Sequence, residues 1–264
     1  MKRILLFCFT LLTFSGLLAQ SLQLTTTDGK LIQNGELIYH GGSPDEYMAA
    51  YVVVTNTGST ALDVLVRKYE IFAANDSSAT FCWGLCFPWF VNESPDPITL
   101  EPGVPSNDFS ADYLPENILG HARVMFTFFD MRNTADSISV YVEFAPSYLG
   151  LSDANGSIPA GTWILREGPH TDIMIHEFAV TNHAAEAKDV QVRRIDNFIV
   201  PGADSYFCWG ACFPPHVIEM ENPVSLMPEQ SSEGFSADYN PKSHSGTSTV
   251  TYVFYDNHNP ADSV

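Results

Sequence analysis

The sequence predicts an all-β protein built from two tandem antiparallel β-sandwich modules that follow a signal peptide. β-branched and aromatic residues gather in short runs, and turn-forming Gly, Pro, Asn and Asp separate these runs roughly every ten residues. No stretch carries a sustained helical period of apolar residues. The second half of the chain also repeats the first, which predicts two copies of one domain.

Residues 1–19 have the layout of a secretory signal peptide. Lys2 and Arg3 precede an apolar run that ends at Leu18, and the small residue Ala19 follows it. A membrane-spanning helix needs about 20 apolar residues, so this shorter run favours cleavage after Ala19 and export to the cell surface or the medium. Cys8 would leave with this segment.

The charge of the mature chain excludes several partners. Without Lys2 and Arg3, ten basic residues face 31 acidic ones, a net charge of −21. Such a surface repels phosphate groups, so we expect no nucleic-acid partner and no insertion of the mature chain into a membrane. A surface protein or a glycan remains as the expected partner.

A shift of 126 residues aligns the two halves without a gap from Val54 to the end. It places the motif FSADY of residues 109–113 on 235–239. A period this long matches a whole domain, so we expect a first module at 22–146 and a second at 147–264.

The second module is shorter than the first at its C-terminal end. Ile138 precedes the alternating run SVYVEF in the first module, and its counterpart Val264 is the last residue. We expect the chain to be a fragment of a longer protein. The alternative is a final strand supplied by another source.

Within a module the pattern predicts seven to nine short strands and therefore an immunoglobulin-like sandwich. A jelly roll is the alternative. Residues 52–66 predict one hairpin, with Val52 and Val54 on the same face as Val64 and a turn at NTGS. The second module lacks this glycine, so a different turn is expected there. The runs that predict strands are 47–56, 62–72, 122–130 and 137–144.

FCWGLCF at residues 81–87 and FCWGACF at 207–213 contain all the cysteines of the mature chain. We expect local disulfides Cys82–Cys86 and Cys208–Cys212, each needing Cα atoms roughly 4.4 to 6.8 Å apart and a reversal at Gly84. Closing so small a ring contributes roughly 2 kcal/mol. A redox pair or a zinc site is disfavoured, because neither Cys-x-x-Cys spacing nor a helix is present.

Three tryptophans near these rings are candidate ligand-binding residues: Trp83, Trp89 and Trp209. Exposed indoles stack on sugar rings, but a Trp beside a small disulfide ring more often packs against it. In FSADY we expect Phe109 and Tyr113 to point inward and Asp112 to point outward.

Two further patterns in the sequence bear on chemistry. Asp130, Asn133 and Asp136, repeated as Asp256, Asn259 and Asp262, could bind calcium, but such residues more often form turns. The sequence contains no recognised catalytic motif, and no histidine recurs at its repeated position. We therefore expect no enzyme activity, no cofactor and no metal.

The phrases FCWGLCFP and FCWGACFP, together with FSADY and the ending NPADSV, resemble the immunoglobulin-like modules of secreted and cell-surface Bacteroidota proteins. Many of those proteins leave the cell through the type IX pathway. The resemblance covers the second half of each module and implies a non-catalytic structural, adhesive or spacer role. The alternative is a carbohydrate-binding module that uses loop aromatics.

Overall fold

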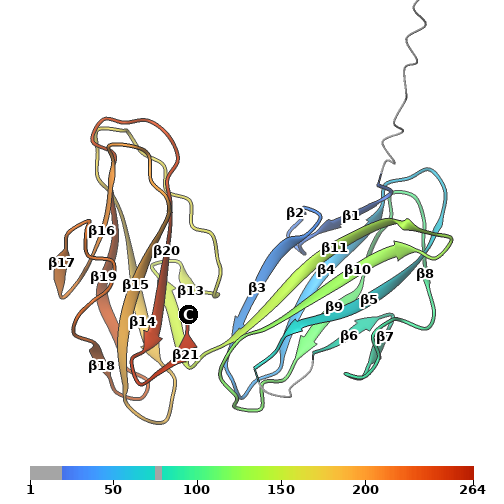
Figure 1. Ribbon diagram of the computed structural model, residues 1–264, viewed down its shortest axis with the longest axis horizontal. Coiled ribbons are helices and arrows are strands. Elements are labelled where there is room, and N and C mark those ends of the chain that lie inside the picture. Colours follow the sequence, from blue (N-terminus) through green and yellow to red (C-terminus); the bar gives the residue numbers. More distant parts are fainter. Residues whose placement is uncertain (1–19, 75–78) are drawn as a thin grey trace, which may run out of the picture.

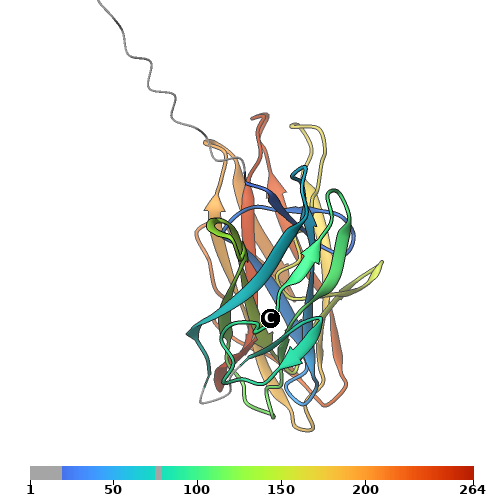
Figure 2. The same ribbon diagram turned by 90° about the vertical axis from the view of Figure 1, so that its right-hand side faces the viewer.

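The computed structural model describes residues 20–74 and 79–264. All regular elements assigned within these residues are β-strands (Figure 1). The all-β prediction is confirmed. The predicted signal peptide 1–19, including Cys8, lies outside the described residues. The two modules follow each other along the long axis of the molecule, and Figure 2 looks along that axis with the first module in front.

In the described residues of the first module, 20–74 and 79–146, eleven strands form two sheets, with orders β2-β1-β4-β9-β6-β7 and β3-β11-β10-β5-β8. Eleven exceeds the predicted seven to nine because several strands are only two to four residues long. The bounds are β1 Leu22–Thr25, β2 Leu31–Ile32, β3 Glu36–Gly42, β4 Met48–Asn56, β5 Leu62–Phe72, β6 Thr80–Trp83, β7 Leu85–Phe87, β8 Ile98–Leu100, β9 Pro105–Tyr113, β10 Ala122–Asp130 and β11 Asn133–Pro146.

The strand pairing is that of an immunoglobulin-like sandwich. β1, β4, β9 and β6 are neighbours in one sheet, and β5, β10 and β11 are neighbours in the other. This is the division into ABED and CFG strands of the constant-type immunoglobulin domain. β3 adds a parallel pairing with the outer edge of β11. This pairing agrees with the predicted immunoglobulin-like sandwich and not with the alternative, a jelly roll.

The predicted hairpin at residues 52–66 is wrong, because β4 and β5 belong to opposite sheets. Asn56 is fully buried between them; its Nδ2 donates to Thr60 O at 2.8 Å and to Leu100 O at 2.9 Å. Its Oδ1 accepts from Gly58 N at 2.8 Å. These bonds turn the chain from one sheet to the other, so Val54 and Val64 enter the core from opposite sheets.

The same crossover recurs in the second module, against the expectation of a different turn. Asn182 donates to Glu186 O at 2.8 Å and Leu226 O at 2.9 Å, and accepts from Ala184 N. Ala184 stands at the position of Gly58, which does not have a positive φ. The turn depends on the buried asparagine and not on the glycine.

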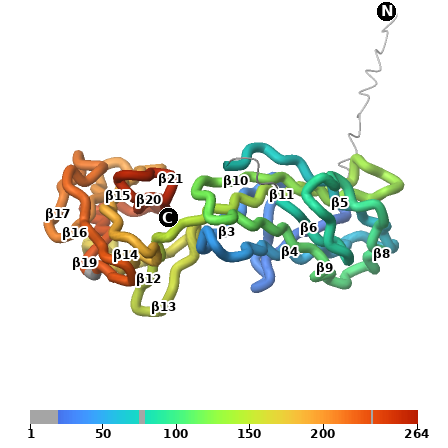
Figure 3. The backbone as a smooth tube through the Cα atoms, turned by 90° about the horizontal axis from the view of Figure 1, so that it is seen from below, coloured from blue at the N-terminus to red at the C-terminus, as the bar shows by residue number. Residues whose placement is uncertain are grey.

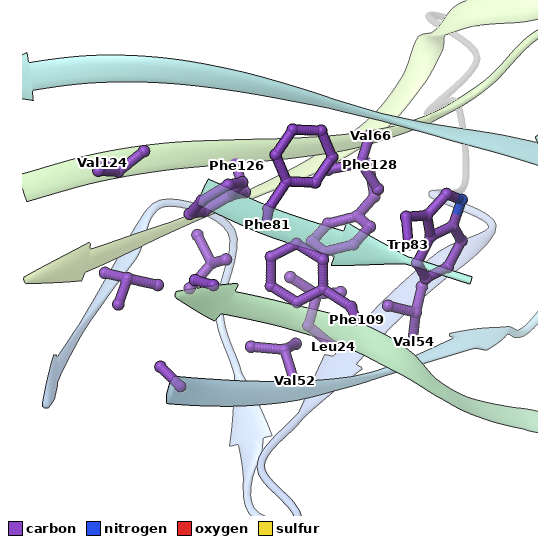
Figure 4. Close-up of a cluster of buried hydrophobic side chains, with 14 of the residues drawn as sticks. Leu24, Val52, Val54, Val66, Phe81, Trp83, Phe109, Val124, Phe126 and Phe128 are labelled. Atoms are coloured by element: carbon purple, nitrogen blue, oxygen red, sulfur yellow. The ribbon is translucent and has the colours of Figure 1, made fainter. Parts of the chain in front are cut away.

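The core of the first module fills the space between its sheets with aliphatic and aromatic side chains (Figure 4). Phe109 packs edge to face on Phe126 and Phe128, with ring centroids 5.1 and 4.8 Å apart. β11 contributes a further row, because Val140, Val142 and Phe144 are fully buried. This row has no counterpart in the described part of the second module.

The second module has two sheets, with orders β13-β12-β14-β19-β16-β17 and β18-β15-β20-β21. β21 is short and pairs with β20 at Tyr255↔Ser263 and Asp256↔Asn259. The bounds are β12 Leu149–Asp153, β13 Gly156–Ile158, β14 Met174–Asn182, β15 Lys188–Phe198, β16 Asp204–Trp209, β17 Ala211–Phe213, β18 Val224–Leu226, β19 Ser231–Asn240, β20 Thr249–Asp256 and β21 Asn259–Ser263.

The connection between the modules passes close to the C-terminal end of the chain (Figure 3), and it is hydrogen-bonded to the last hairpin of the second module. Asp262 Oδ1 accepts from Ser147 Oγ at 2.7 Å and from Tyr148 N at 2.8 Å. Tyr148 OH in turn donates to Asn117 Oδ1 of the first module at 3.2 Å. The linker is thereby fixed to one module and bonded to the other.

Candidate functional site

Both predicted disulfides are present, each closing a hairpin at the edge of a sheet. In each hairpin the two cysteines pair directly across the strands, β6 with β7 and β16 with β17. Their Cα atoms are 3.9 Å apart, which is closer than predicted. The distance is short because the two cysteines stand directly opposite each other on adjacent antiparallel strands. Gly84 and Gly210 reverse the chain at φ 70° and 71°, in the left-handed region that glycine enters without steric cost.

Trp83 and Trp209 point into the core and are not exposed aromatic platforms. Only 2 % and 4 % of their surfaces are exposed. Trp83 Nε1 donates to Val64 O at 2.9 Å, and Trp209 Nε1 donates to Ser232 Oγ at 2.9 Å. The prediction that these two indoles bind a ligand is therefore corrected, because a buried ring offers no face for a sugar.

Trp89 differs, since 60 % of its surface is exposed. Leu85 and Phe90 are exposed beside the same hairpin, and the rings of Trp89 and Phe90 meet edge to face at 5.6 Å. We call Leu85, Trp89 and Phe90 the apolar tip. Sequence reasoning found Trp89 but missed the other two. The second module replaces all three with smaller or polar residues: Ala211, Pro215 and His216.

A buried lysine beneath the apolar tip holds its backbone. Lys68 Nζ donates to Trp89 O at 2.6 Å and to Ala79 O at 2.7 Å, and it lies 3.4 Å from Glu70 Oε1. Burial lowers the pKa of Lys68, and the Glu70 carboxylate opposes this shift. A charged donor that bonds two carbonyls fixes the start of the loop more firmly than a neutral donor would.

Arg194 does the same at the repeated position. It donates to Ser205 O at 2.6 Å and to Pro215 O, and it pairs with Asp196. The sequence did carry a signal for this pair of anchors: a basic residue followed two positions later by an acidic one, at the same place in both modules. Hydrophobic periodicity does not reveal this pair, because a cation is not expected on the inward face of a strand.

A shallow hollow lies beside the apolar tip and is lined by polar groups from β5 and from the loop between β7 and β8. Its lining residues are Arg67, Lys68, Tyr69, Glu70, Asn92 and Glu93. Arg67 Nε donates to Glu93 Oε2 at 2.6 Å, and its guanidinium lies over the Phe129 ring at 4.9 Å. The hollow therefore combines hydrogen-bonding groups with neighbouring exposed aromatic side chains.

Asp112 lies on the outer face of its sheet as predicted, but it is buried against the disulfide. Its Oδ2 is 3.3 Å from Cys82 Sγ and accepts from Ser110 Oγ at 3.1 Å. Burial raises the pKa of Asp112, and the hydrogen bonds from Tyr47 and Ser110 oppose this. Asp238 is placed in the same way beside Cys208, and burial raises its pKa too.

In the second module the residues proposed for calcium hold a lysine ammonium. Lys188 Nζ lies 3.0 Å from Asp256 Oδ2 and 3.2 Å from Asp262 Oδ2, and all three side chains are buried. The cation between these carboxylates therefore belongs to the protein itself. In the first module Asp136 instead accepts from Ser21 N at 2.9 Å and Asp130 from Arg132 N at 3.1 Å.

Within residues 20–74 and 79–264 no group of three or more His, Cys, Asp or Glu side chains is arranged to hold a metal ion. No helix in these same residues is long and apolar enough to cross a membrane.

Comparisons with known proteins give structural likenesses alone. No family model matches the sequence, and no curated protein matches it. The N-terminal domain of PorA is 18% identical with a TM-score of 0.40, covering 47% of this chain and 96% of that one. The PapD-like domain 7 of human CEP192 is 12% identical with a TM-score of 0.30, covering 48% of this chain and 85% of that one. A chain from the chaperone–tip adhesin complex of CFA/I fimbriae is 9% identical with a TM-score of 0.31, covering 81% and 87%.

Proposed function

We propose that the protein is an exported, non-catalytic adhesive module of the cell surface or the medium, and that the apolar tip of its first module contacts a protein partner. The observation that carries this proposal is the exposure of Leu85, Trp89 and Phe90 on a loop that a disulfide and Lys68 hold in place. Aromatic side chains fixed before contact lose little entropy on binding, which favours affinity.

Two further features support this role. The linker bonds of Asp262 hold the modules in a defined arrangement, so the second module can act as a spacer. The resemblance to immunoglobulin-like modules of secreted Bacteroidota proteins points to the same compartment, and the strong negative charge suits a soluble surface protein.

A second candidate function is carbohydrate binding at Trp89. The shallow hollow beside the apolar tip offers Arg67, Asn92 and Glu93 as hydrogen-bonding groups for sugar hydroxyls. An exposed indole with polar groups alongside is a common arrangement for holding a sugar ring. Trp83 and Trp209 take no part in this proposal.

Binding of the labelled mature protein to a glycan array and to immobilised matrix proteins tests both candidates. The double variant Trp89→Ala/Phe90→Ala should lose the signal, whereas Trp163→Ala, which alters an even more exposed indole in the second module, should keep it. Signal on protein spots supports the adhesive role, and signal on sugars supports the second candidate. Binding that survives the double variant, or blank arrays, would count against the apolar tip as the contact surface.

A further inference from the structure

A buried lysine of the second module contacts two buried carboxyl groups. Lys188 lies at the start of β15, Asp256 at the end of β20 and Asp262 in β21. Lys188 Nζ is 3.0 Å from Asp256 Oδ2 and 3.2 Å from Asp262 Oδ2, and the three side chains are 7 %, 5 % and 0 % exposed. Glu186 Oε1 is 3.8 Å from the same Nζ, but its side chain is 81 % exposed. Moving an ammonium and two carboxylates out of water is costly.

The first module shows that the fold does not require this lysine. The shift of 126 residues places Leu62 at the position of Lys188, and Leu62 packs against the core. Both carboxyl groups are kept there, as Asp130 and Asp136. β5 still pairs with β10 as β15 does with β20. The lysine therefore adds something that the framework alone does not need.

The two carboxyl groups around Lys188 are held differently. Asp262 Oδ1 accepts from Ser147 Oγ at 2.7 Å and from Tyr148 N at 2.8 Å. Among the described residues no well-aligned donor bonds Asp262 Oδ2, although this oxygen faces Lys188 Nζ. Two donors on one oxygen stabilise the negative charge that develops there when a nucleophile attacks the carbon, as in an oxyanion hole. Asp262 is thus arranged as an electrophile.

Asp256 is arranged as the base. Lys188 Nζ donates a hydrogen bond to Asp256 Oδ2. Burial lowers the pKa of Lys188, but the two carboxylates outweigh this effect and raise it, so the resting group is an ammonium. An ammonium has no free lone pair, so it must give a proton to a base before it can attack a carbon atom. Asp256 Oδ2 is at the distance needed to accept that proton.

We propose that Lys188 and Asp262 join in an intramolecular amide bond, with Asp256 as the proton relay. Lys188 Nζ gives up two of its three protons, and Asp256 passes them to Asp262 Oδ2. The Nζ lone pair forms the bond to Cγ of Asp262, the bond from Cγ to Oδ2 breaks, and Oδ2 leaves as water. One proton stays on the amide nitrogen and Asp256 returns to its starting state, so the step needs no oxidant or reductant.

The amide ties together two strands that are not neighbours. β15 and β21 lie on either side of β20, and the bond spans it beside the connection between the modules. A buried ammonium and carboxylate are replaced by one neutral group, which removes the cost of burying them. The inference goes beyond the proposed function, because it concerns a single event within the chain and does not involve the apolar tip.

Peptide mapping of the mature protein by mass spectrometry, after denaturation and reduction of the disulfides, tests the bond. We expect trypsin not to cleave after Lys188, and residues 167–193 to stay joined to the peptide that begins at Ser243, with the loss of one water molecule. Lys68 is the internal control: its side chain is also buried, but its partner Glu70 is 38 % exposed, so cleavage there should proceed. Complete cleavage after Lys188 would overturn the proposal.

Variants assign the roles. Lys188→Arg keeps the positive charge and should leave the two peptides unlinked. Asp256→Asn should leave most of the chain unlinked, whereas Asp130→Asn, the same change at the repeated position of the first module, should link fully. A folded Asp256→Asn protein that links fully, with its fold checked by circular dichroism, would contradict the role of Asp256 as the relay.

Asp262→Asn identifies the carbon that is attacked. Its side-chain amide should leave as ammonia in place of water, so the linked peptides should have the same mass as those of the wild type. Linked peptides that still carry this side-chain amide would place the bond on Asp256 and overturn the assignment of Asp262.

Discussion

Trp83 and Trp89 lie on the same hairpin and its loop, yet one is buried and the other exposed. We expect Trp83→Ala to lower the free energy of unfolding by about 3 to 5 kcal/mol, because it leaves a large cavity in the core. Trp89→Ala should change it by less than about 0.5 kcal/mol. Urea denaturation of the two variants measures the difference, and equal losses would show that the assignment of the two environments is wrong.

The burial of Trp83 could have been predicted from the sequence, but the segment around it was interpreted as a loop. Phe81 and Trp83 alternate with Cys82, so a period of two would have placed both aromatics inward and the sulfur outward. Only four residues carry this pattern before Gly84 reverses the chain. A period over so few residues is weak evidence, whereas the nine residues of β4 made that strand easy to predict.

The raised pKa of Asp112 has a consequence for pH dependence. A carboxyl group whose pKa is higher in the folded state stabilises the fold fully below its unfolded pKa, and this contribution is lost as the pH rises through the folded pKa. We therefore expect Asp112→Asn to gain stability relative to the wild type as the pH rises from mildly acidic to neutral. Urea denaturation at both pH values measures this.

Asp96→Asn is the matched control, since Asp96 is exposed on a loop of the same module. The stability difference between this variant and the wild type should vary less with pH than that of Asp112→Asn. A pH-independent difference for Asp112→Asn would contradict burial of its charged form.

At the scale of elements, each disulfide hairpin adds stability locally. Replacing Cys82 and Cys86 with serine should lower the free energy of unfolding by roughly 2 kcal/mol, the value for closing a very short loop. Hydrogen exchange should rise in β7 and in the apolar tip, while β4 and β9 keep their protection. Increased exchange throughout the first module would show that the bond supports the whole sandwich.

Lys68 is the second anchor of the apolar tip. Lys68→Met removes the donor for two buried carbonyl groups, so we expect a loss of about 1 to 3 kcal/mol and faster hydrogen exchange at residues 88–92. Lys68→Arg should retain most of the stability, because Arg194 makes the equivalent bonds in the second module. If Lys68→Met were as stable as the wild type, the hydrogen bonds from Lys68 to Ala79 O and Trp89 O would be dispensable.

The elements were more predictable than their pairing. The runs at 62–72 and 122–130 are strands with the same bounds in the structure. The hairpin at 52–66 failed because a turn signal does not reveal whether the chain returns in the same sheet. That outcome depends on Asn56, whose side chain bonds Leu100 O far along the chain, and local patterns carry no information about such contacts.

At the scale of the whole molecule, Asp262 sets how the modules are joined. Asp262→Ala removes the acceptor for Ser147 and Tyr148, so we expect a loss of roughly 1 to 3 kcal/mol in the second module. It should also broaden the distribution of inter-module distances in small-angle scattering. Asp262→Asn keeps an acceptor oxygen but loses the charge beside Lys188, and it should show a smaller broadening. Identical scattering for all three proteins would contradict the role of this residue.

The repeat was the strongest indication of the overall architecture in the sequence, but the contacts at the connection between the modules could not be predicted. Asp256 and Asp262 share a pattern with metal ligands, and nothing local indicates that Lys188, at the start of a distant strand, supplies the cation. The bond from Asp262 to the linker is likewise a contact between the two ends of one module.

The paired anchors Lys68 and Arg194 have a practical consequence. Both modules hold the disulfide hairpin at its two ends, through bonds to Ala79 O and Trp89 O in the first and to Ser205 O and Pro215 O in the second. The hairpins share FCWG and CFP, yet Leu85, Trp89 and Phe90 of the first are replaced by Ala211, Pro215 and His216 in the second. The framework thus stays the same while the exposed residues at these three positions change. Other residues could be introduced there, and selection from a library of such variants would turn this protein into a reagent with a chosen target.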